Sequence, residues 1–393
     1  MSSPAGRPGA AGLPAAELLD EATAKTGLDD WGCDLGFVST LELLLESCWE
    51  TGELTPLGWD VLHKVVVRHL RNRLYVQAFL RARGGYLPAI QAPVVVTGLP
   101  RTGTTLLHNL LALDPAHRVL RFWEGLHPVP PDPSRGITEE ALVAQAQAWL
   151  DRLYALAPRF RAIHGATPTG PEECDALLQN SFASQHFDDM FRAEAYSRWL
   201  NNASLLDEYA HYARQLQVLT RPDQEQLRWA LKSPSHLGYL DTLRQALPGA
   251  VIVQCHRDPC EAVASYASLV LAVRSPYRDA VPLEEVGGHA LGRSALATER
   301  ALRARTGAAD HGFVDVAYRR LVDDPLGAVE ELYERLGRTL EGEADDAMAA
   351  WIAANPRHKH GRHDYSLERF GLSAEAVAER LRPYLDRFGA YAA

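Results

Sequence analysis

The residues from Gly98 to Thr105 have the types and spacing of an anion-binding loop. The apolar β-branched run Val94–Val96 precedes the loop, and a leucine-rich segment with helical spacing follows it. A buried strand, a glycine-containing loop and a helix N-terminus together direct backbone N–H groups and the positive end of the helix dipole at one place. With Arg101 between its glycines, this stretch predicts a phosphate or sulfate site.

The spacing Gly98-x4-Gly103 is that of a Walker A loop, but Thr104 stands where nucleotide triphosphatases have a lysine. That lysine neutralises the β- and γ-phosphates, and here Arg101 is the only cationic residue of the loop. The loop therefore favours a group that carries less charge than a magnesium-bound triphosphate.

A second candidate phosphate site follows another apolar run. Arg257 follows a predicted strand, Asp258 and Pro259 are typical of a helix start, and Ser265 lies eight residues after Arg257. A guanidinium fork and a hydroxyl on one helix face suit a phosphate. Taken alone, an arginine paired with a carboxylate and a serine bonded within its helix would explain these residues equally well. Two such loops at the ligand-binding edge of one parallel sheet favour a ligand.

Two further residues follow predicted strands. Lys232 directly follows the run 227–231, and Tyr318 begins a Y-x-x-L-x-x-D-P segment that ends at Pro325. A lysine at a strand end is often only solvated, and a tyrosine beside a helix often belongs to the core. At the carboxyl edge of a parallel sheet we expect Lys232 to face a ligand.

The segment Leu99–Thr105 resembles the 5′-phosphosulfate loop of sulfotransferases that use 3′-phosphoadenosine-5′-phosphosulfate (PAPS). Its arginine form is similar to protein-tyrosine sulfotransferases and a broad group of bacterial sulfotransferases. The resemblance extends from about residue 27 to residue 388 and implies transfer of a sulfuryl group from PAPS to a hydroxyl, less commonly an amine, of a small-molecule, lipid or sugar acceptor.

The resemblance also implies roles for individual residues. Arg257 and Ser265 would hold the 3′-phosphate, Tyr318 would lie beside the adenine, and Lys232 would lie near the phosphosulfate. Lys359, in a basic C-terminal segment, would contact the bisphosphate. The loop residues expected to contact the cofactor are Pro100, Arg101, Thr102, Gly103, Thr104 and Thr105.

Sulfuryl transfer to a hydroxyl needs a group that accepts the acceptor's proton. Glu124 lies near the position at which tyrosine sulfotransferases have their catalytic glutamate, and we expect it to be the base, with Arg101 and Lys232 as its catalytic partners. Cytosolic sulfotransferases use histidine, which makes His127 and His164 the alternatives. An ion pair between Glu124 and Arg121 or Arg101 is the structural alternative.

Alternating apolar runs and helical segments predict an α/β fold, a P-loop NTPase-like parallel sheet flanked by helices. The strands are expected at 93–97, 227–231, 251–254 and 313–316. Residues 274–293 are expected to be loop-like. We divide the chain into a disordered N-terminus (1–14), an α-helical cap (15–90), a core (91–340) with a helical insertion at about 138–220, and a C-terminal basic loop and helix (341–393).

Composition excludes several classes of function. A net charge of −10 argues against a non-specific nucleic-acid binder, which is normally basic. Five scattered cysteines predict neither a zinc site nor a disulfide framework and favour a cytoplasmic location. His358, His360 and His363 lie among cationic residues, so we expect no metal. No apolar stretch is long enough to span a membrane.

Two alternatives belong to other classes. A P-loop small-molecule kinase would need a Walker lysine and a magnesium-binding acid at a strand end, and neither is evident. A catalytically silent nucleotide-binding protein would not need Arg101, Lys232, Arg257 and Ser265 together. The sequence leaves the acceptor and the oligomeric state open.

Overall fold

The computed structural model describes residues 13–51, 53–84, 86–158, 160–163, 165–356 and 365–392, so the N-terminus expected to be disordered lies almost entirely outside them. Its centre is a five-stranded parallel sheet with the strand order β2-β3-β1-β4-β5. The strands are β1 (Val94–Gly98), β2 (His117–Arg118), β3 (Arg228–Lys232), β4 (Val251–His256) and β5 (Phe313–Ala317). The four expected strands and the α/β fold are confirmed, and the short β2 is an addition.

The two faces of the sheet belong to different parts of the core. Val94 and Val96 of β1 face one side, where they pack with apolar residues of the helices that follow β1 and β5. Val95 faces the other side and joins a larger cluster that extends to the N-terminal helices. All three valines are fully buried, as expected for a central parallel strand covered on both faces.

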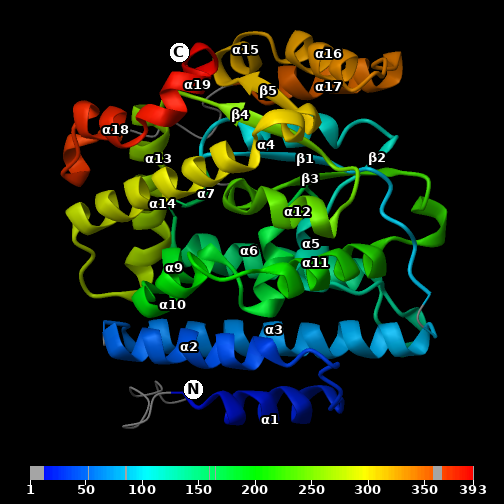
Figure 1. Cartoon of the computed structure of the whole chain (residues 1–393). Helices are drawn as coiled ribbons and strands as arrows, with labels where there is room; N and C mark the ends of the chain where they lie inside the picture. The colour runs from blue at the N-terminus through cyan, green and yellow to red at the C-terminus, as the bar shows by residue number, and fades with distance from the viewer. Residues whose placement is uncertain are drawn as a thin grey trace.

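Helices cover both faces of the sheet (Figure 1). Three helices precede β1 and form the blue layer at the bottom of Figure 1, namely α1 (Ala15–Thr26), α2 (Gly36–Thr51) and α3 (Pro56–Ala82). Those between β1 and β3 are α4 (Thr104–Leu111), α5 (Phe122–Leu126), α6 (Glu139–Leu156), α7 (Phe160–Ile163), α8 (Asp175–Leu178), α9 (Gln185–Phe191), α10 (Glu194–Leu200) and α11 (Leu206–Leu219). Those after β3 are α12 (Leu240–Ala246), α13 (Pro259–Arg274), α14 (Leu283–Ala304), α15 (Tyr318–Asp323), α16 (Pro325–Arg335), α17 (Gly342–Ala354), α18 (Ala374–Arg380) and α19 (Arg382–Ala392).

Helix α14 corrects the expectation of a loop over residues 274–293. The helix begins at Leu283, and acidic Glu284 and Glu285 occupy its first turn, where they complement the helix dipole. Its glycines serve packing: a Cβ on Gly287 would lie 2.2 Å from the carbonyl oxygen of Phe370. Within this helix, Gly287 therefore permits close approach to another segment and does not end the helix.

The C-terminal helix anchors the end of β4. The ring of His256 packs on Phe388 of α19, with 4.6 Å between ring centroids, and its Nδ1 lies 2.8 Å from the hydroxyl of Tyr384. Its Nε2 lies 2.7 Å from a carboxylate oxygen of Asp315 on β5. These contacts fix the strand end that carries Arg257 into the site. Among the helices described, none combines the length and apolar character needed to cross a membrane.

Candidate active site

The loop between β1 and α4 has the backbone conformation that its glycines predict. Gly98 has φ +147°, and a Cβ there would lie 2.4 Å from the carbonyl oxygen of Cys255 on β4. Gly103 has φ +89° and directly precedes α4, so Thr104 and Thr105 supply the first backbone N–H groups of that helix. These groups have no partner within a helix and are suited to an anion.

Arg101 is held in an unusual backbone conformation. Its φ of +72° lies in the left-handed region, which non-glycine residues rarely adopt. Its Nε donates to Ser265 Oγ at 3.2 Å, and its carbonyl oxygen accepts from Arg257 Nη1 at 2.9 Å. The strained conformation therefore joins the first predicted phosphate loop to the second.

The second loop also has the predicted form. The Asp258 side chain caps α13 by accepting from the backbone N–H of Cys260, and Pro259 is the first residue of the helix. The Arg257 guanidinium lies 4.3 Å from the ring centroid of Tyr318 and pairs with Glu261 (2.9 and 2.6 Å). The structure thus brings Arg257 and Tyr318 together with Arg101 and Ser265.

These residues surround a cavity of about 450 Å³ at the carboxyl edge of the sheet. Its lining includes the loop residues, Tyr318, and Trp351 and Asn355 of the α17 region. It also includes residues of the segment between β2 and β3 and of α13 and α14, called here the polar lining, namely Glu173, Asp175, Gln185, His186, Asp189, Tyr266 and Arg293. A cavity of this size at this edge is suited to a nucleotide and a second small molecule.

Lys232 ends β3 opposite Val96 of β1, and its side chain is 2% exposed. Its ammonium group forms an ion pair with the carboxylate of Glu173, which lines the cavity. The carbonyl oxygen of Lys232 also accepts from the backbone N–H of Cys174 at 2.9 Å. Lys232 itself does not belong to the residues that line the cavity, and Glu173 is the lining residue that its ammonium group contacts.

Glu173 is a site residue that the sequence analysis missed. It lies in the acidic segment Glu172–Asp175, far from any glycine loop, and only the backbone contact at the end of β3 brings it to the site. Burial and the charge of Glu173 raise the pKa of the neighbouring Glu172 to about 7, but Glu172 does not line the cavity. The sequence signal available was the acidic run itself.

The structure argues against Glu124 as the base. Glu124 is 5% exposed, and its carboxylate accepts from Arg118 Nη2 at 2.6 Å and from Arg118 Nη1 at 2.9 Å. It also accepts from the backbone N–H of Arg121, which completes the N-terminal cap of α5. It does not line the cavity. The structural alternative, an ion pair, therefore applies, with Arg118 as its partner.

Of the histidine alternatives and Lys359, the described residues include only His127. His127 does not line the cavity, and burial together with the charges of Arg68 and Arg71 lowers its pKa to about 4. His164 and Lys359 lie outside the described residues. In the part of the chain that the structure covers, no group of three or more histidine, cysteine or acidic side chains could hold a metal ion.

Comparisons with known proteins agree with this geometry. A sequence model of the sulfotransferase family matches residues 93–342, which is more than half of the chain. The crystal structure of sulfotransferase STF1 from Mycobacterium tuberculosis H37Rv is similar, with a TM-score of 0.81 and 33% identity over 94% of this chain and 98% of that one. Sulfotransferase STF9 from Mycobacterium avium has a TM-score of 0.81 and 28% identity, over 95% and 96%. A search of curated proteins found no match. The chain belongs to the sulfotransferase family.

Proposed function

We propose that the chain transfers the sulfuryl group of PAPS to a hydroxyl of a small-molecule acceptor. The observation that carries the proposal is that the two predicted phosphate loops lie side by side at one cavity, joined through Arg101, Arg257 and Ser265. A cytoplasmic location remains a prediction.

Arg101 and Arg257 are 156 positions apart in the sequence. Folding brings these two arginines within hydrogen-bond distance, at 2.9 Å between Arg257 Nη1 and the Arg101 carbonyl oxygen. Two cationic groups at one cavity match a ligand with two separate phosphate groups.

Each part of PAPS has candidate partners in this cavity. The backbone N–H groups at the start of α4 and the Arg101 guanidinium would hold the 5′-phosphosulfate. Arg257 and Ser265 would hold the 3′-phosphate, with Arg257 exchanging its contact with Glu261 for the ligand. Tyr318, which lines the cavity beside Arg257, would contact the adenine. Recognition of the 3′-phosphate would separate PAPS from ATP.

The proposed reaction is an in-line displacement at sulfur. The acceptor oxygen forms a bond to sulfur while the bond between sulfur and the bridging phosphate oxygen breaks, which yields a sulfate ester and adenosine 3′,5′-bisphosphate. The acceptor proton passes to a base, for which we propose Glu173 in place of Glu124. Lys232 and Arg101 would stabilise the negative charge that develops on the departing oxygen.

Glu173 has three properties that Glu124 lacks. Its carboxylate lines the cavity, it contacts Lys232, and its charge acts on Arg101, so it lies near both cations assigned to the phosphosulfate. A lysine shared between the base and the leaving oxygen would couple deprotonation of the acceptor to departure of the phosphate.

Calorimetry with adenosine 3′,5′-bisphosphate and with ATP, each with Mg²⁺ and with EDTA, tests the proposal. We expect metal-independent binding of the bisphosphate, weakened at least about tenfold in Arg257→Ala, because a charge-assisted contact is lost. Arg303→Ala is the matched control, since Arg303 is an exposed arginine of α14 that pairs with Glu299. Preference for Mg-ATP would favour a kinase, and absence of binding to both nucleotides would contradict the proposal.

A further inference from the structure

The polar lining of the cavity is rich in acidic groups. Asp175 of α8 and Asp189 of α9 line it, together with Glu173. Glu173 is neutralised by Lys232, which leaves the two aspartates as the carboxylates to be explained. The two aspartates have different surroundings, and each favours a cationic ligand.

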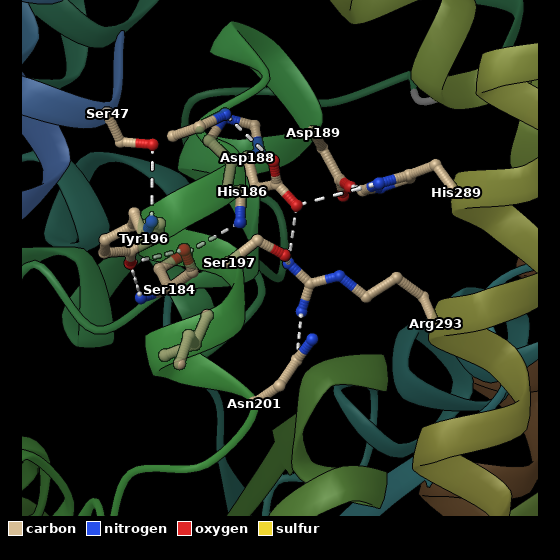
Figure 2. A network of polar contacts seen from close by, with 12 residues as sticks. Ser47, Ser184, His186, Asp188, Asp189, Tyr196, Ser197, Asn201, His289 and Arg293 are labelled. Atoms are coloured by element: carbon tan, nitrogen blue, oxygen red, sulfur yellow. Dashed lines mark hydrogen bonds and ion pairs between the residues drawn. The ribbon is translucent and has the colours of Figure 1, made fainter. Parts of the chain in front are cut away.

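Asp189 is a fixed carboxylate at the cavity wall (Figure 2). It accepts from the hydroxyl of Tyr266 (2.9 and 3.1 Å) and lies 2.7 Å from His289 Nε2. Burial alone would raise its pKa, but the hydrogen bond with His289 and the charges of Arg293 and Arg274 hold the pKa below its usual value. The carboxylate therefore stays ionised while it faces the cavity.

Asp175 provides an independent observation. It is 7% exposed, and its Oδ2 accepts from Ser184 Oγ at 2.7 Å and from Gln179 Nε2 at 3.2 Å. Its Oδ1 has no hydrogen-bond partner among the described residues. Burial raises the pKa of Asp175, and the charge of His186 and the hydrogen bond from Ser184 offset that effect only in part. A buried carboxylate oxygen without a donor is costly, and a cation nearby would offset that cost.

Arg293 also lines the cavity, and other residues already bind it (Figure 2). Its Nη2 donates to Asp188 Oδ2 at 2.9 Å and to Ser197 Oγ at 3.2 Å, and its Nη1 donates to Asn201 Oδ1 at 3.3 Å. Its direct ion pair is thus with Asp188, while its charge helps to keep Asp189 ionised.

We propose that the acceptor carries a protonated aliphatic amine beside its hydroxyl, and that the amine binds to Asp189 in the cavity that Asp175 also lines. This inference rests on the proposed sulfuryl transfer, because it takes the polar lining of the cavity as the acceptor site. Carboxylate- and phosphate-bearing acceptors would be repelled, and neutral acceptors would lack the ionic contact. The acceptor is thus an amino alcohol or an aminoalkyl phenol.

Three phenols that differ only in the para substituent test this inference. The probes are 4-(2-aminoethyl)phenol, 4-ethylphenol and 3-(4-hydroxyphenyl)propanoate, titrated calorimetrically into the protein saturated with adenosine 3′,5′-bisphosphate. At pH 8 an ordinary histidine is neutral and the amine is protonated. We expect the cation to bind at least about tenfold more tightly than the neutral phenol, and the anion to bind most weakly.

Asp189→Asn should abolish the preference for the cation and leave the affinity for 4-ethylphenol within about twofold, because the amide keeps the shape without the charge. Glu299→Gln removes one negative charge from an exposed position on α14, and this variant should keep the preference for the cation. Equal binding of the three phenols, preference for the anion, or an unchanged preference in Asp189→Asn would overturn the inference. Failure of the bisphosphate itself to bind would instead contradict the proposed function, which separates the two.

Discussion

Replacing Glu173 with glutamine tests the proposed chemistry most directly. The amide keeps the size of the side chain and can still accept a hydrogen bond from Lys232, but it cannot accept the acceptor proton. We expect kcat to fall about 10²- to 10⁴-fold, the usual contribution of a general base. That range corresponds to about 2.7 to 5.4 kcal/mol in the activation free energy.

The same change has a cost in stability that the structure allows us to bound. Lys232 is 2% exposed and loses its counter-ion, and breaking a fully buried ion pair from one side costs about 3 to 5 kcal/mol. Glu173 is 26% exposed, so water reaches the pair, and we expect the free energy of unfolding to fall by only about 1 to 2 kcal/mol. The variant should therefore remain folded at 25 °C.

The assay combines steady-state turnover of an amine-bearing phenol with PAPS, calorimetric binding of adenosine 3′,5′-bisphosphate and thermal unfolding. Glu172→Gln is the matched control, because it removes an adjacent carboxyl that does not line the cavity. Turnover of Glu173→Gln within about threefold of the parent, with the bisphosphate bound normally, would refute the assignment. An equal loss in both variants would show that the effect comes from the acidic segment as a whole.

Three further outcomes follow from the geometry. Glu124→Gln should lower the free energy of unfolding by about 3 kcal/mol or more because it breaks a buried pair with Arg118, while kcat of the folded enzyme stays within about twofold; a large loss of kcat without a loss of stability would return Glu124 to the chemistry. Burial would raise the pKa of Asp315, but hydrogen bonds, first that from Arg305, hold this pKa well below its usual value. The contribution of Asp315 to stability is therefore complete above about pH 4 and is lost as the pH falls. Urea unfolding should show a smaller acid loss in Asp315→Asn, and parallel pH profiles would contradict this. Gly98→Ala should abolish bisphosphate binding or cost about 2 kcal/mol or more in urea unfolding, since its Cβ would meet a backbone carbonyl of β4; a normal variant would show that the loop can shift.

The grouping of Arg101, Arg257, Ser265 and Tyr318 at one cavity could be predicted because its signals are local in the sequence. A β-branched run, two glycines and an N-capping aspartate each act within a few residues of Arg101 or Arg257, and the parallel fold places both strand ends at one edge. Gly98 is an example: the need for a residue without a Cβ arises from β4, but the glycine that satisfies it can be read in the loop itself.

The proposed acceptor side could not be predicted because its residues are placed by contacts between distant segments. Glu173 reaches the site through a backbone bond at the end of β3, and Asp189 through Tyr266 and His289, which lie 77 and 100 residues away in the sequence. The expectation for Glu124 rested on its distance along the chain from the loop. That distance does not determine where the carboxylate points, whereas the ion pair with Arg118 does.

This difference explains why family membership identifies the donor side more readily than the acceptor. Strand, loop and helix start form a continuous segment, so any chain that keeps the segment keeps the anion site. The proposed acceptor site is made from α8, α9, α13 and α14, and a change in any of these can alter the charge that faces the cavity. An identity of 33% to STF1 therefore identifies the fold and sulfuryl transfer in general, whereas the acceptor that we propose depends on carboxylates such as Asp189 that line the cavity.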